Sequence, residues 1–391
     1  MKGAGIMLRI GVIGFGKQGQ LYSGILSGTA QGNWPVLPKP KDCMLTAVSA
    51  RSEEAKAAIE SIPHVQYFKD WRDLIASDAC DAVVITVPHL AHHEIAIAAL
   101  EAGKHVLCEK PMTIRASDAE AIVAAAERNP NSKLAMMLNQ RSNPLLRKIK
   151  HIVDSGELGQ LRNSYYLNNN WWRPDNYYTD NNWRGTWKGE GGGILVNQAP
   201  HPQDLWIWLC GMPQSVYAVC REGAYRDIAV ENDVMVIAKY PNGTQGIFTA
   251  CSHDLMGTDR LELAFDKGKI VLENNRKATV LRYADTEQGF GERYDFRSFG
   301  GVLAKTPETV YTKEELADSS VFADDYVAMF ENFAAHVLRG EELIATGYAG
   351  LEQVRLANAI RLSGWTGREI QLPCDTEEYN VYLNRKIAEE T

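Results

Sequence analysis

The 391-residue sequence lacks long apolar runs, paired-cysteine motifs and an excess of positive charge. No stretch approaches the roughly 18 consecutive apolar residues of a membrane-spanning helix, and the N-terminal segment lacks the cleavage site of a signal peptide. The seven cysteines are scattered without a C-x-x-C pair, which disfavours a disulfide framework and a zinc site. With a net charge of −8, the chain has no electrostatic footprint for nucleic acid or an anionic membrane. We therefore expect a cytoplasmic protein with a small-molecule partner and no metal site.

The first third of the chain alternates short apolar runs with amphipathic segments. Strands that alternate with helices indicate a parallel sheet with helices on both faces. We expect a doubly wound Rossmann domain over residues 1–142. Its predicted strands are residues 8–13, 44–49, 65–68, 82–87, 105–108 and 134–138, and its predicted helices are residues 17–26, 53–62, 92–102 and 117–128.

The pattern changes after about Arg141. Short strands in series, separated by turn residues, indicate a largely antiparallel sheet. We expect a second domain of the α+β class over residues 143–391. Its predicted strands are residues 216–220, 233–240, 245–251, 261–265, 269–273 and 279–283, and its predicted helices are residues 144–154, 194–209, 325–338 and 351–362.

A glycine-rich turn follows the first predicted strand and opens the first predicted helix. The first glycine of a G-x-G-x-x-G pattern allows a tight turn, the second lets a pyrophosphate approach the backbone, and the third lets the helix pack on the strand. The helix N-terminus adds free N–H groups and a partial positive charge. In this setting the motif predicts a dinucleotide site, with a purely structural turn as the alternative. The residues are Gly14, Phe15, Gly16, Lys17, Gln18 and Gly19.

The end of the second predicted strand bears on the choice between NAD and NADP. NAD sites usually place an acidic residue there for the ribose 2′-hydroxyl, whereas this chain has Ala50, Arg51 and Ser52. Arg51 and Ser52 can hold a 2′-phosphate by charge-assisted hydrogen bonds. The sequence therefore favours NADP. The alternative is a solvated Arg51, with Glu53 or Glu54 supplying the carboxylate.

Two later strands end in residues suited to the rim of the same site. Val87 and Pro88 end one strand and Glu109 and Lys110 follow the next, and ligands bind at the carboxyl ends of strands in open α/β sheets. A lysine there can hold a substrate hydroxyl and stabilise the alkoxide that develops as hydride leaves. His92 begins the helix between these strands and belongs to the same cofactor-binding set, although a structural role is its favoured interpretation.

Two long motifs resemble the signatures of one family. The stretches "ALEAGKHVLCEKP" (residues 99–111) and "GEGGGILVNQAPHPQDLWIWLCG" (residues 189–211) resemble the Gfo/Idh/MocA oxidoreductases, named after glucose–fructose oxidoreductase, inositol dehydrogenase and a rhizopine-catabolism protein. The resemblance implies a dinucleotide domain, then a domain with a large open sheet through which a homodimer or homotetramer forms. It implies NAD(P)-dependent chemistry on a sugar or cyclitol, with Lys110 and His201 catalytic. The usual aspartate four residues before the histidine is Asn197 here, which can bind a hydroxyl but cannot take up a proton.

Further candidates for substrate binding come from helix spacing and from an aromatic segment. On the predicted helix 194–209, Asn197 would share one face with His201 and Asp204, although two prolines indicate a kink or a late start. Residues 163–190 combine aromatic rings with Asn and Arg, which suits a polyhydroxylated ligand or, alternatively, a subunit interface. Asn139 and Arg141 follow the last predicted strand of the first domain and should face the same crevice. The substrate-binding candidates are Asn139, Arg141, Trp172, Arg173, Trp183, Arg184, Asn197 and Asp204.

Three functions are compatible with these residues. The leading one is an oxidoreductase that acts on a ring hydroxyl or ketone of a sugar, sugar derivative or cyclitol, with Lys110 positioning the oxygen and His201 relaying the proton. A glycosidase that oxidises the ring transiently and releases the aglycone by elimination would show no net change in NAD(P)H. A non-catalytic nucleotide-binding regulatory protein would need neither Lys110 nor His201.

Overall fold

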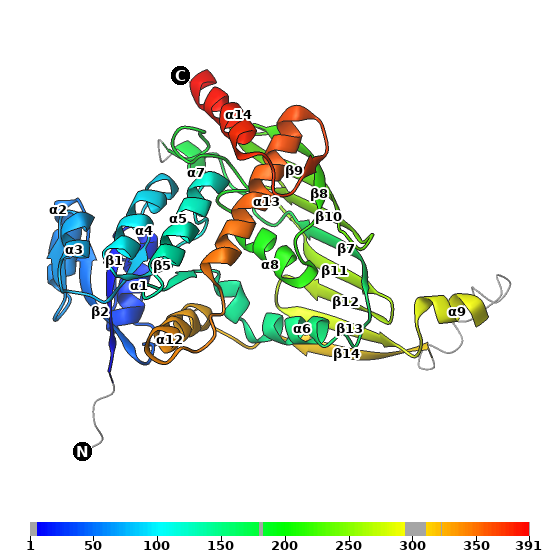
Figure 1. Cartoon of the computed structure of the whole chain (residues 1–391), viewed down its shortest axis with the longest axis horizontal. Helices are drawn as coiled ribbons and strands as arrows, with labels where there is room; N and C mark the ends of the chain where they lie inside the picture. Colours follow the sequence, from blue (N-terminus) through cyan, green and yellow to red (C-terminus); the bar gives the residue numbers. More distant parts are fainter. Residues whose placement is uncertain (1–5, 180–182, 294–309, 322, 391) are drawn as a thin grey trace, which may run out of the picture. The chain divides into compact units, whose positions relative to one another are not determined.

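The computed structural model in Figure 1 describes residues 6–179, 183–293, 310–321 and 323–390. The chain forms two compact units, each treated separately below. The first contains Met1–Ser142 and Ser320–Arg355, and the second contains Asn143–Ser319 and Leu356–Thr391. In the described part of the chain, no helix is long and apolar enough to cross a membrane. The cytoplasmic location stays a prediction.

The first unit is built on a six-stranded sheet in the order β3-β2-β1-β4-β5-β6, and all of its strand pairs are parallel. This is the doubly wound architecture that the alternating pattern predicted. Its strands are β1 (Leu8–Ile13), β2 (Cys43–Ser49), β3 (Gln66–Phe68), β4 (Ala82–Ile85), β5 (His105–Cys108) and β6 (Leu134–Met136). Its helical segments include α1 (Lys17–Ser27), α2 (Glu53–Glu60), α3 (Trp71–Ala76), η1 (His89–Ala91), α4 (His92–Glu101), α5 (Ala116–Arg128) and η2 (Asn139–Ser142).

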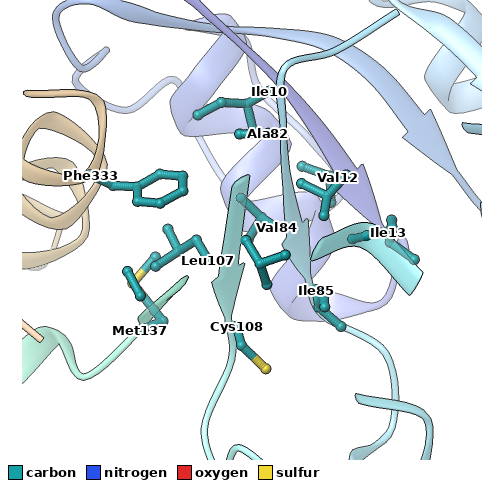
Figure 2. Close-up of a cluster of buried hydrophobic side chains, with 14 of the residues drawn as sticks. Ile10, Val12, Ile13, Ala82, Val84, Ile85, Leu107, Cys108, Met137 and Phe333 are labelled. Atoms are coloured by element: carbon teal, nitrogen blue, oxygen red, sulfur yellow. The ribbon is translucent and has the colours of Figure 1, made fainter. Parts of the chain in front are cut away.

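The core of the first unit lies along the central strands (Figure 2). Ile10 and Val12 of β1, Val84 of β4 and Leu107 of β5 have no exposed side-chain surface. A parallel sheet is covered by helices on both faces, so its strands read as continuous apolar runs rather than as alternating ones. This property made them recognisable in the sequence.

One helix of this core comes from far along the chain. Helix α12 (Asp324–Arg339) buries Phe330 and Phe333 in the same cluster as β1 and β4, and the Phe330 ring lies 5.3 Å from that of Tyr22 on α1. The sequence placed all of residues 143–391 in the second domain, whereas residues 320–355 pack with the first unit. The apolar stripe of α12 predicted a helix correctly, but periodicity does not identify the surface that a helix packs against.

The second unit is built on a nine-stranded sheet in the order β14-β13-β12-β11-β7-β10-β9-β8-β15. Only the β7–β10 pair is parallel, so the sheet is largely antiparallel as predicted. Its strands are β7 (Leu161–Asn168), β8 (Ser215–Glu222), β9 (Glu231–Lys239), β10 (Gln245–Cys251), β11 (Asp259–Phe265), β12 (Gly268–Glu273), β13 (Lys277–Tyr283), β14 (Tyr311–Ala317) and β15 (Ile370–Gln371). Its helices include α6 (Pro144–Asp154), α7 (Asn176–Thr179), α8 (Pro200–Cys210), α9 (Glu287–Arg293) and α14 (Thr376–Glu389), while α13 (Gly347–Thr366) contains the division between the units.

Helix α8 begins at Pro200, six residues later than the predicted start. The backbone before it forms turns, and the Ile194 N–H donates a 2.9 Å hydrogen bond to the Glu231 carbonyl of β9. Proline suits the first turn of a helix, because its missing N–H would have no intrahelical acceptor there. The expectation that Asn197 lies on the same helix as His201 is therefore wrong. Asn197 lies in the turn that leads into α8.

Candidate functional site

The glycine-rich turn between β1 and α1 has the geometry that the motif predicted. Gly14 has a φ of 103°, and a Cβ on Gly19 would collide with the Gly14 carbonyl, so both positions need glycine. A Cβ on Gly16, by contrast, would meet no protein atom within 4 Å. Gly16 is also the N-cap of α1, with no side-chain cap and no acidic residue in the first turn. The turn therefore leaves open space beside a helix N-terminus, which fits a pyrophosphate.

The predicted cofactor residues all follow the carboxyl ends of strands in this one sheet. In the strand order 3-2-1-4-5-6 the order in which successive strands are added reverses between β1 and β4, and dinucleotides bind at this point in doubly wound folds. The glycine turn follows β1, Ala50 to Ser52 follow β2, and Val87 and Pro88 follow β4. Glu109 and Lys110 follow β5. The residues present therefore fit a nicotinamide dinucleotide.

At the end of β2, Arg51 is exposed while Ala50 is buried. The Arg51 side chain makes no hydrogen bond or ion pair with any described residue. Ser52 is the N-cap of α2, where its hydroxyl oxygen accepts a 3.1 Å hydrogen bond from the Ala55 N–H. Glu53 and Glu54 lie in the first turn of α2, where the positive end of the helix dipole stabilises a carboxylate. The cation is thus the charged group directly at the strand end.

His92 is a buried residue that joins two loops of the rim. Its side chain is 1% exposed, and its ring nitrogens lie 3.0 Å from the Pro111 carbonyl oxygen and 2.9 Å from that of Val87. Burial lowers the pKa of this imidazole, because a charged ring is poorly solvated there. His92 therefore holds the loop after β4 against the loop after β5, in line with the structural role favoured for it.

Beside Lys110 lies a buried carboxyl group. Glu109 is 9% exposed, and its Oε2 accepts a 2.9 Å hydrogen bond from the Lys110 backbone N–H. Its Oε1 accepts a hydrogen bond from the hydroxyl of Tyr22, a fully buried residue of α1. Burial raises the pKa of Glu109, while the Lys110 ammonium and the Tyr22 hydroxyl act in the opposite direction. The carboxyl thus fixes the backbone at Lys110, whose own side chain is half-buried.

Asn139 and Arg141 lie in η2, which follows the last strand of the sheet. The Asn139 carbonyl accepts a 2.7 Å hydrogen bond from the Ser142 hydroxyl, and Arg141 is 9% exposed. Both residues therefore follow the carboxyl edge that carries the cofactor set.

In the second unit, Asn197 is joined to a carboxylate that the sequence interpretation did not single out. Its side-chain N–H groups donate to Oε1 of Glu190 and, over 3.1 Å, to the hydroxyl of Tyr177. The Tyr177 hydroxyl also accepts a 3.1 Å hydrogen bond from the Gln198 side chain. Oε2 of Glu190 accepts from the Gly185 N–H over 2.8 Å, and the residue is 2% exposed.

The aromatic segment supplies cations and rings to the same group. The Arg184 guanidinium lies 4.2 Å from the centre of the Tyr177 ring and 5.2 Å from that of Trp183. The Arg173 guanidinium also lies near this ring, 5.1 Å from its centre. Trp172, the fourth predicted residue of this segment, is 38% exposed. Three of the four predicted residues therefore meet around Tyr177 or its neighbours.

His201 is the second residue of α8 and is half-buried, whereas Asp204, one turn further, is 1% exposed. The glycines that precede α8 pack against their own unit. A Cβ on Gly193 would collide with the Glu231 carbonyl, and the Arg361 side chain donates a 2.7 Å hydrogen bond to the Gly191 carbonyl. Packing within the unit therefore explains the glycines, and His201 belongs to the second unit while Lys110 belongs to the first.

Two family models match the chain. One, described as an oxidoreductase family with an NAD-binding Rossmann fold, covers residues 8–136, and the other, a GFO/IDH/MocA C-terminal domain, covers residues 146–271. The chain belongs to the Gfo/Idh/MocA oxidoreductase family.

Relatives in this family include dehydrogenases of cyclitols and sugars. The inositol 2-dehydrogenase of Salmonella typhimurium is 32% identical over 153 residues, which are 39% of this chain and only 43% of the enzyme. That of Rhizobium meliloti is 26% identical over 93% of this chain and 99% of the enzyme. The solved WlbA dehydrogenase of Chromobacterium violaceum, in complex with NADH and UDP-GlcNAcA, has a TM-score of 0.74 at 25% identity, over 94% of this chain and 97% of that one.

Within the Gfo/Idh/MocA chain, Tyr22, Tyr177 and Glu190 were not predicted as site residues. Tyr22 lies among apolar residues of α1, so nothing in the sequence separates it from the core. Tyr177 is one of many aromatic residues in its segment. Glu190 directly precedes the three glycines of the second signature, and its position there was the available signal.

Proposed function

We propose that this protein is an NAD(P)-dependent oxidoreductase that converts a ring hydroxyl of a sugar, sugar derivative or cyclitol into a ketone, or the reverse. The observation that carries the proposal is the sheet of the first unit. It presents an open glycine turn at an uncapped helix N-terminus after β1 and a lysine after β5. Both belong to the edge where ligands bind in this architecture.

In this proposal a bound nicotinamide dinucleotide supplies the hydride acceptor or donor. Lys110 holds the reacting oxygen through its ammonium group and stabilises the negative charge that develops on that oxygen. Glu109 and Tyr22 keep the backbone at Lys110 in place. His201 takes up or returns the hydroxyl proton, because an imidazole titrates near neutrality.

The proposed substrate class rests on the side chains around Tyr177. Aromatic rings stack on the C–H faces of sugars, and amide and guanidinium groups read hydroxyls. Tyr177, Arg173, Arg184 and Asn197 combine these groups within one cluster. We assign hydroxyl recognition to this cluster, with further contacts from the remaining candidates, namely Asn139, Arg141, Trp172, Trp183 and Asp204. Relatives named for inositol and a solved relative with a nucleotide sugar agree with this class.

NADP is the proposed cofactor. The support is Arg51, an exposed cation at the end of β2 that has no ion-pair partner among the described residues, and the absence of a carboxylate at Ala50. An arginine there binds a 2′-phosphate by charge-assisted hydrogen bonds. The two nearby glutamates, Glu53 and Glu54, lie in the first turn of α2, where the positive end of the helix dipole stabilises their charge.

A homodimer or homotetramer formed through the nine-stranded sheet is the proposed assembly. The adjacent strands β7, β10, β9 and β8 carry exposed apolar side chains. These side chains lie in two rows that run across the strands, because their positions are paired in the sheet register. A contiguous apolar patch of this kind is typical of a protein interface. The residues are Tyr165, Leu167, Tyr217, Val219, Met235, Ile237 and Ile247, which are between 38% and 61% exposed.

A substrate screen tests the proposed activity. Purified protein is incubated with NAD⁺ or NADP⁺ and with monosaccharides, cyclitols and aryl glycosides, while absorbance at the reduced nicotinamide band and released aglycone are followed together. We expect cofactor reduction by at least one polyol. Aglycone release without net reduction would instead identify redox-neutral glycoside cleavage. The absence of both, with cofactor binding intact, would contradict an enzymatic role.

A further inference from the structure

Glu190 is a buried carboxyl group to which the proposed reaction assigns no role. It lies seven residues before Asn197, and both of its oxygens accept hydrogen bonds, Oε2 from the Gly185 N–H at 2.8 Å and Oε1 from the Asn197 side chain. The Asn197 amide nitrogen has two hydrogens, and the second is donated to the Tyr177 hydroxyl. Because the amide nitrogen faces Glu190 and Tyr177, the oxygen of the planar amide group faces another direction.

The two donors to Glu190 differ in what they can do when the carboxyl takes up a proton. The Gly185 N–H belongs to the backbone and cannot become an acceptor, so Oε2 must remain the carbonyl oxygen. The proton then resides on Oε1, which faces Asn197. A side-chain amide carries an acceptor at one end and donors at the other, so Asn197 can rotate and accept this proton with its oxygen. Its NH2 group then faces the direction that its oxygen faced before.

We propose that Glu190 is a positioning residue whose protonation state decides which end of the Asn197 amide faces the substrate. With Glu190 ionised, Asn197 presents an acceptor, which matches an alcohol that donates its hydroxyl proton. With Glu190 neutral, Asn197 presents a donor, which matches a ketone that can only accept. This assignment rests on the proposed function, because it takes Asn197 to bind the substrate oxygen.

The surroundings of Glu190 place this change within the working range of an enzyme. Burial raises the pKa of Glu190 to about 7, opposed by the Gly185 N–H, the Asn197 amide and the Arg184 guanidinium. A second buried carboxyl, Glu231, raises it further by like-charge repulsion. Among the described residues, Tyr177 and Tyr178 also lie beside the pair, and the Arg173 guanidinium lies 5.1 Å from the centre of the Tyr177 ring. The pKa of Tyr178 is itself raised by burial.

The first test observes the Asn197 side chain directly and needs no substrate. The protein is labelled with ¹⁵N asparagine, and the Asn197 NH2 signals are assigned by their loss in Asn197→Ala. We expect these signals to titrate near neutral pH in the intact chain and to be independent of pH in Glu190→Gln. The matched control is Glu231→Gln, another buried glutamate whose Oε2 accepts from the Gly193 N–H at 3.0 Å instead of from Asn197, and this variant should still titrate. Circular dichroism establishes that each variant is folded.

The second test uses kinetics, with the polyol found in the screen. We expect the KM for the polyol to rise roughly three- to tenfold from mildly alkaline to mildly acidic pH, because the loss of one hydrogen bond weakens binding by about this factor. The KM for the corresponding ketone should change in the opposite sense, and both should be flat in Glu190→Gln. If Asn197 does not titrate, or titrates equally in Glu190→Gln, the proposal is overturned whether or not the enzyme is active. If Asn197 titrates as expected but no polyol is oxidised, the proposed function fails and the coupling between Glu190 and Asn197 stands.

Discussion

Tyr22 donates a hydrogen bond from its hydroxyl to Oε1 of Glu109, a residue 87 positions further along the chain. Both side chains are buried, and the other Glu109 oxygen accepts from the Lys110 backbone. The helix that follows the glycine-rich turn is thereby tied to the backbone of the proposed catalytic lysine. The hydrogen bond between Tyr22 and Glu109 therefore connects the first helix of the proposed cofactor site with the loop that carries Lys110.

Replacement of Tyr22 by Phe should destabilise the protein. The substitution keeps the ring but removes the donor to a buried carboxyl, and an unsatisfied buried polar group costs about 1–3 kcal/mol. We expect the free energy of unfolding, measured by urea denaturation, to fall by this amount. Tyr348→Phe, at a tyrosine that is 53% exposed, is the control and should change it little. Equal stability of Tyr22→Phe and the wild type would show that the hydrogen bond is not needed.

Replacement of Arg51 by Asp should weaken NADP binding and favour NAD. Loss of a charge-assisted contact to the 2′-phosphate costs about 1.5–3 kcal/mol, and the new carboxylate can accept from a ribose hydroxyl. The measurement is a titration of each cofactor by fluorescence or calorimetry, in which NAD serves as the internal control. An unchanged affinity for NADP would remove Arg51 from the cofactor site.

Replacement of Lys110 by Met should abolish most turnover and leave cofactor binding intact. The loss of the cation that stabilises the developing alkoxide should lower the rate on the order of 10²- to 10³-fold. Lys133→Met provides a matched control. Lys133 directly precedes β6, at the amino-terminal ends of the strands, and its ammonium group donates a hydrogen bond to the Pro130 carbonyl. Near-normal turnover of Lys110→Met would favour a regulatory protein instead.

Replacement of His201 by Asn should slow the chemical step about 10²- to 10⁴-fold and remove one limb of the pH–rate profile. His151→Asn, at an exposed position in the last turn of α6, is the control and should keep both rate and profile. Steady-state rates over a range of pH make the comparison. A profile that keeps its shape in His201→Asn would place the proton relay on another residue.

Replacement of Ile237 by Asp should dissociate the oligomer. Ile237 is 52% exposed on β9, and its cross-strand neighbours Tyr217 and Ile247 are also exposed, so a charge there would be buried within an apolar interface. Light scattering after size exclusion should give the mass of one chain for this variant and a multiple of it for the wild type. Val381→Asp, on the exposed side of α14, should leave the oligomer intact. A monomeric wild type would contradict the proposed interface.

Local sequence information predicted the strands of the first sheet and the geometry of its glycine-rich turn. The six residues from Gly14 to Gly19 are contiguous in the sequence, so their glycine spacing is recognisable locally. The strands of a covered parallel sheet are likewise short apolar runs. The contact between Tyr22 and Glu109 could not be predicted in this way, because it joins positions 87 residues apart through the packing of α1 on the sheet.

The second-unit cluster was harder for a related reason. Asn197 was assigned to a helical face by its spacing from His201, yet its backbone turns before Pro200 and its side chain bonds to Glu190 and Tyr177. These three residues lie in turns and in a single helical turn, where no periodicity marks which side chains will meet. The residue types pointed to polar chemistry, whereas the partners depended on loop conformation.

The return of residues 320–355 to the first unit limits how this architecture can be cut and recombined. A fragment that ends at Ser142 would lack Phe330 and Phe333, so the apolar surface around Ile10 and Tyr22 would face water. An exchange of the whole first unit between relatives therefore requires two inserts, residues 1–142 and residues 320–355, rather than one exchange of the N-terminal third. The first unit is therefore contiguous in space but is formed by two separate segments of the sequence.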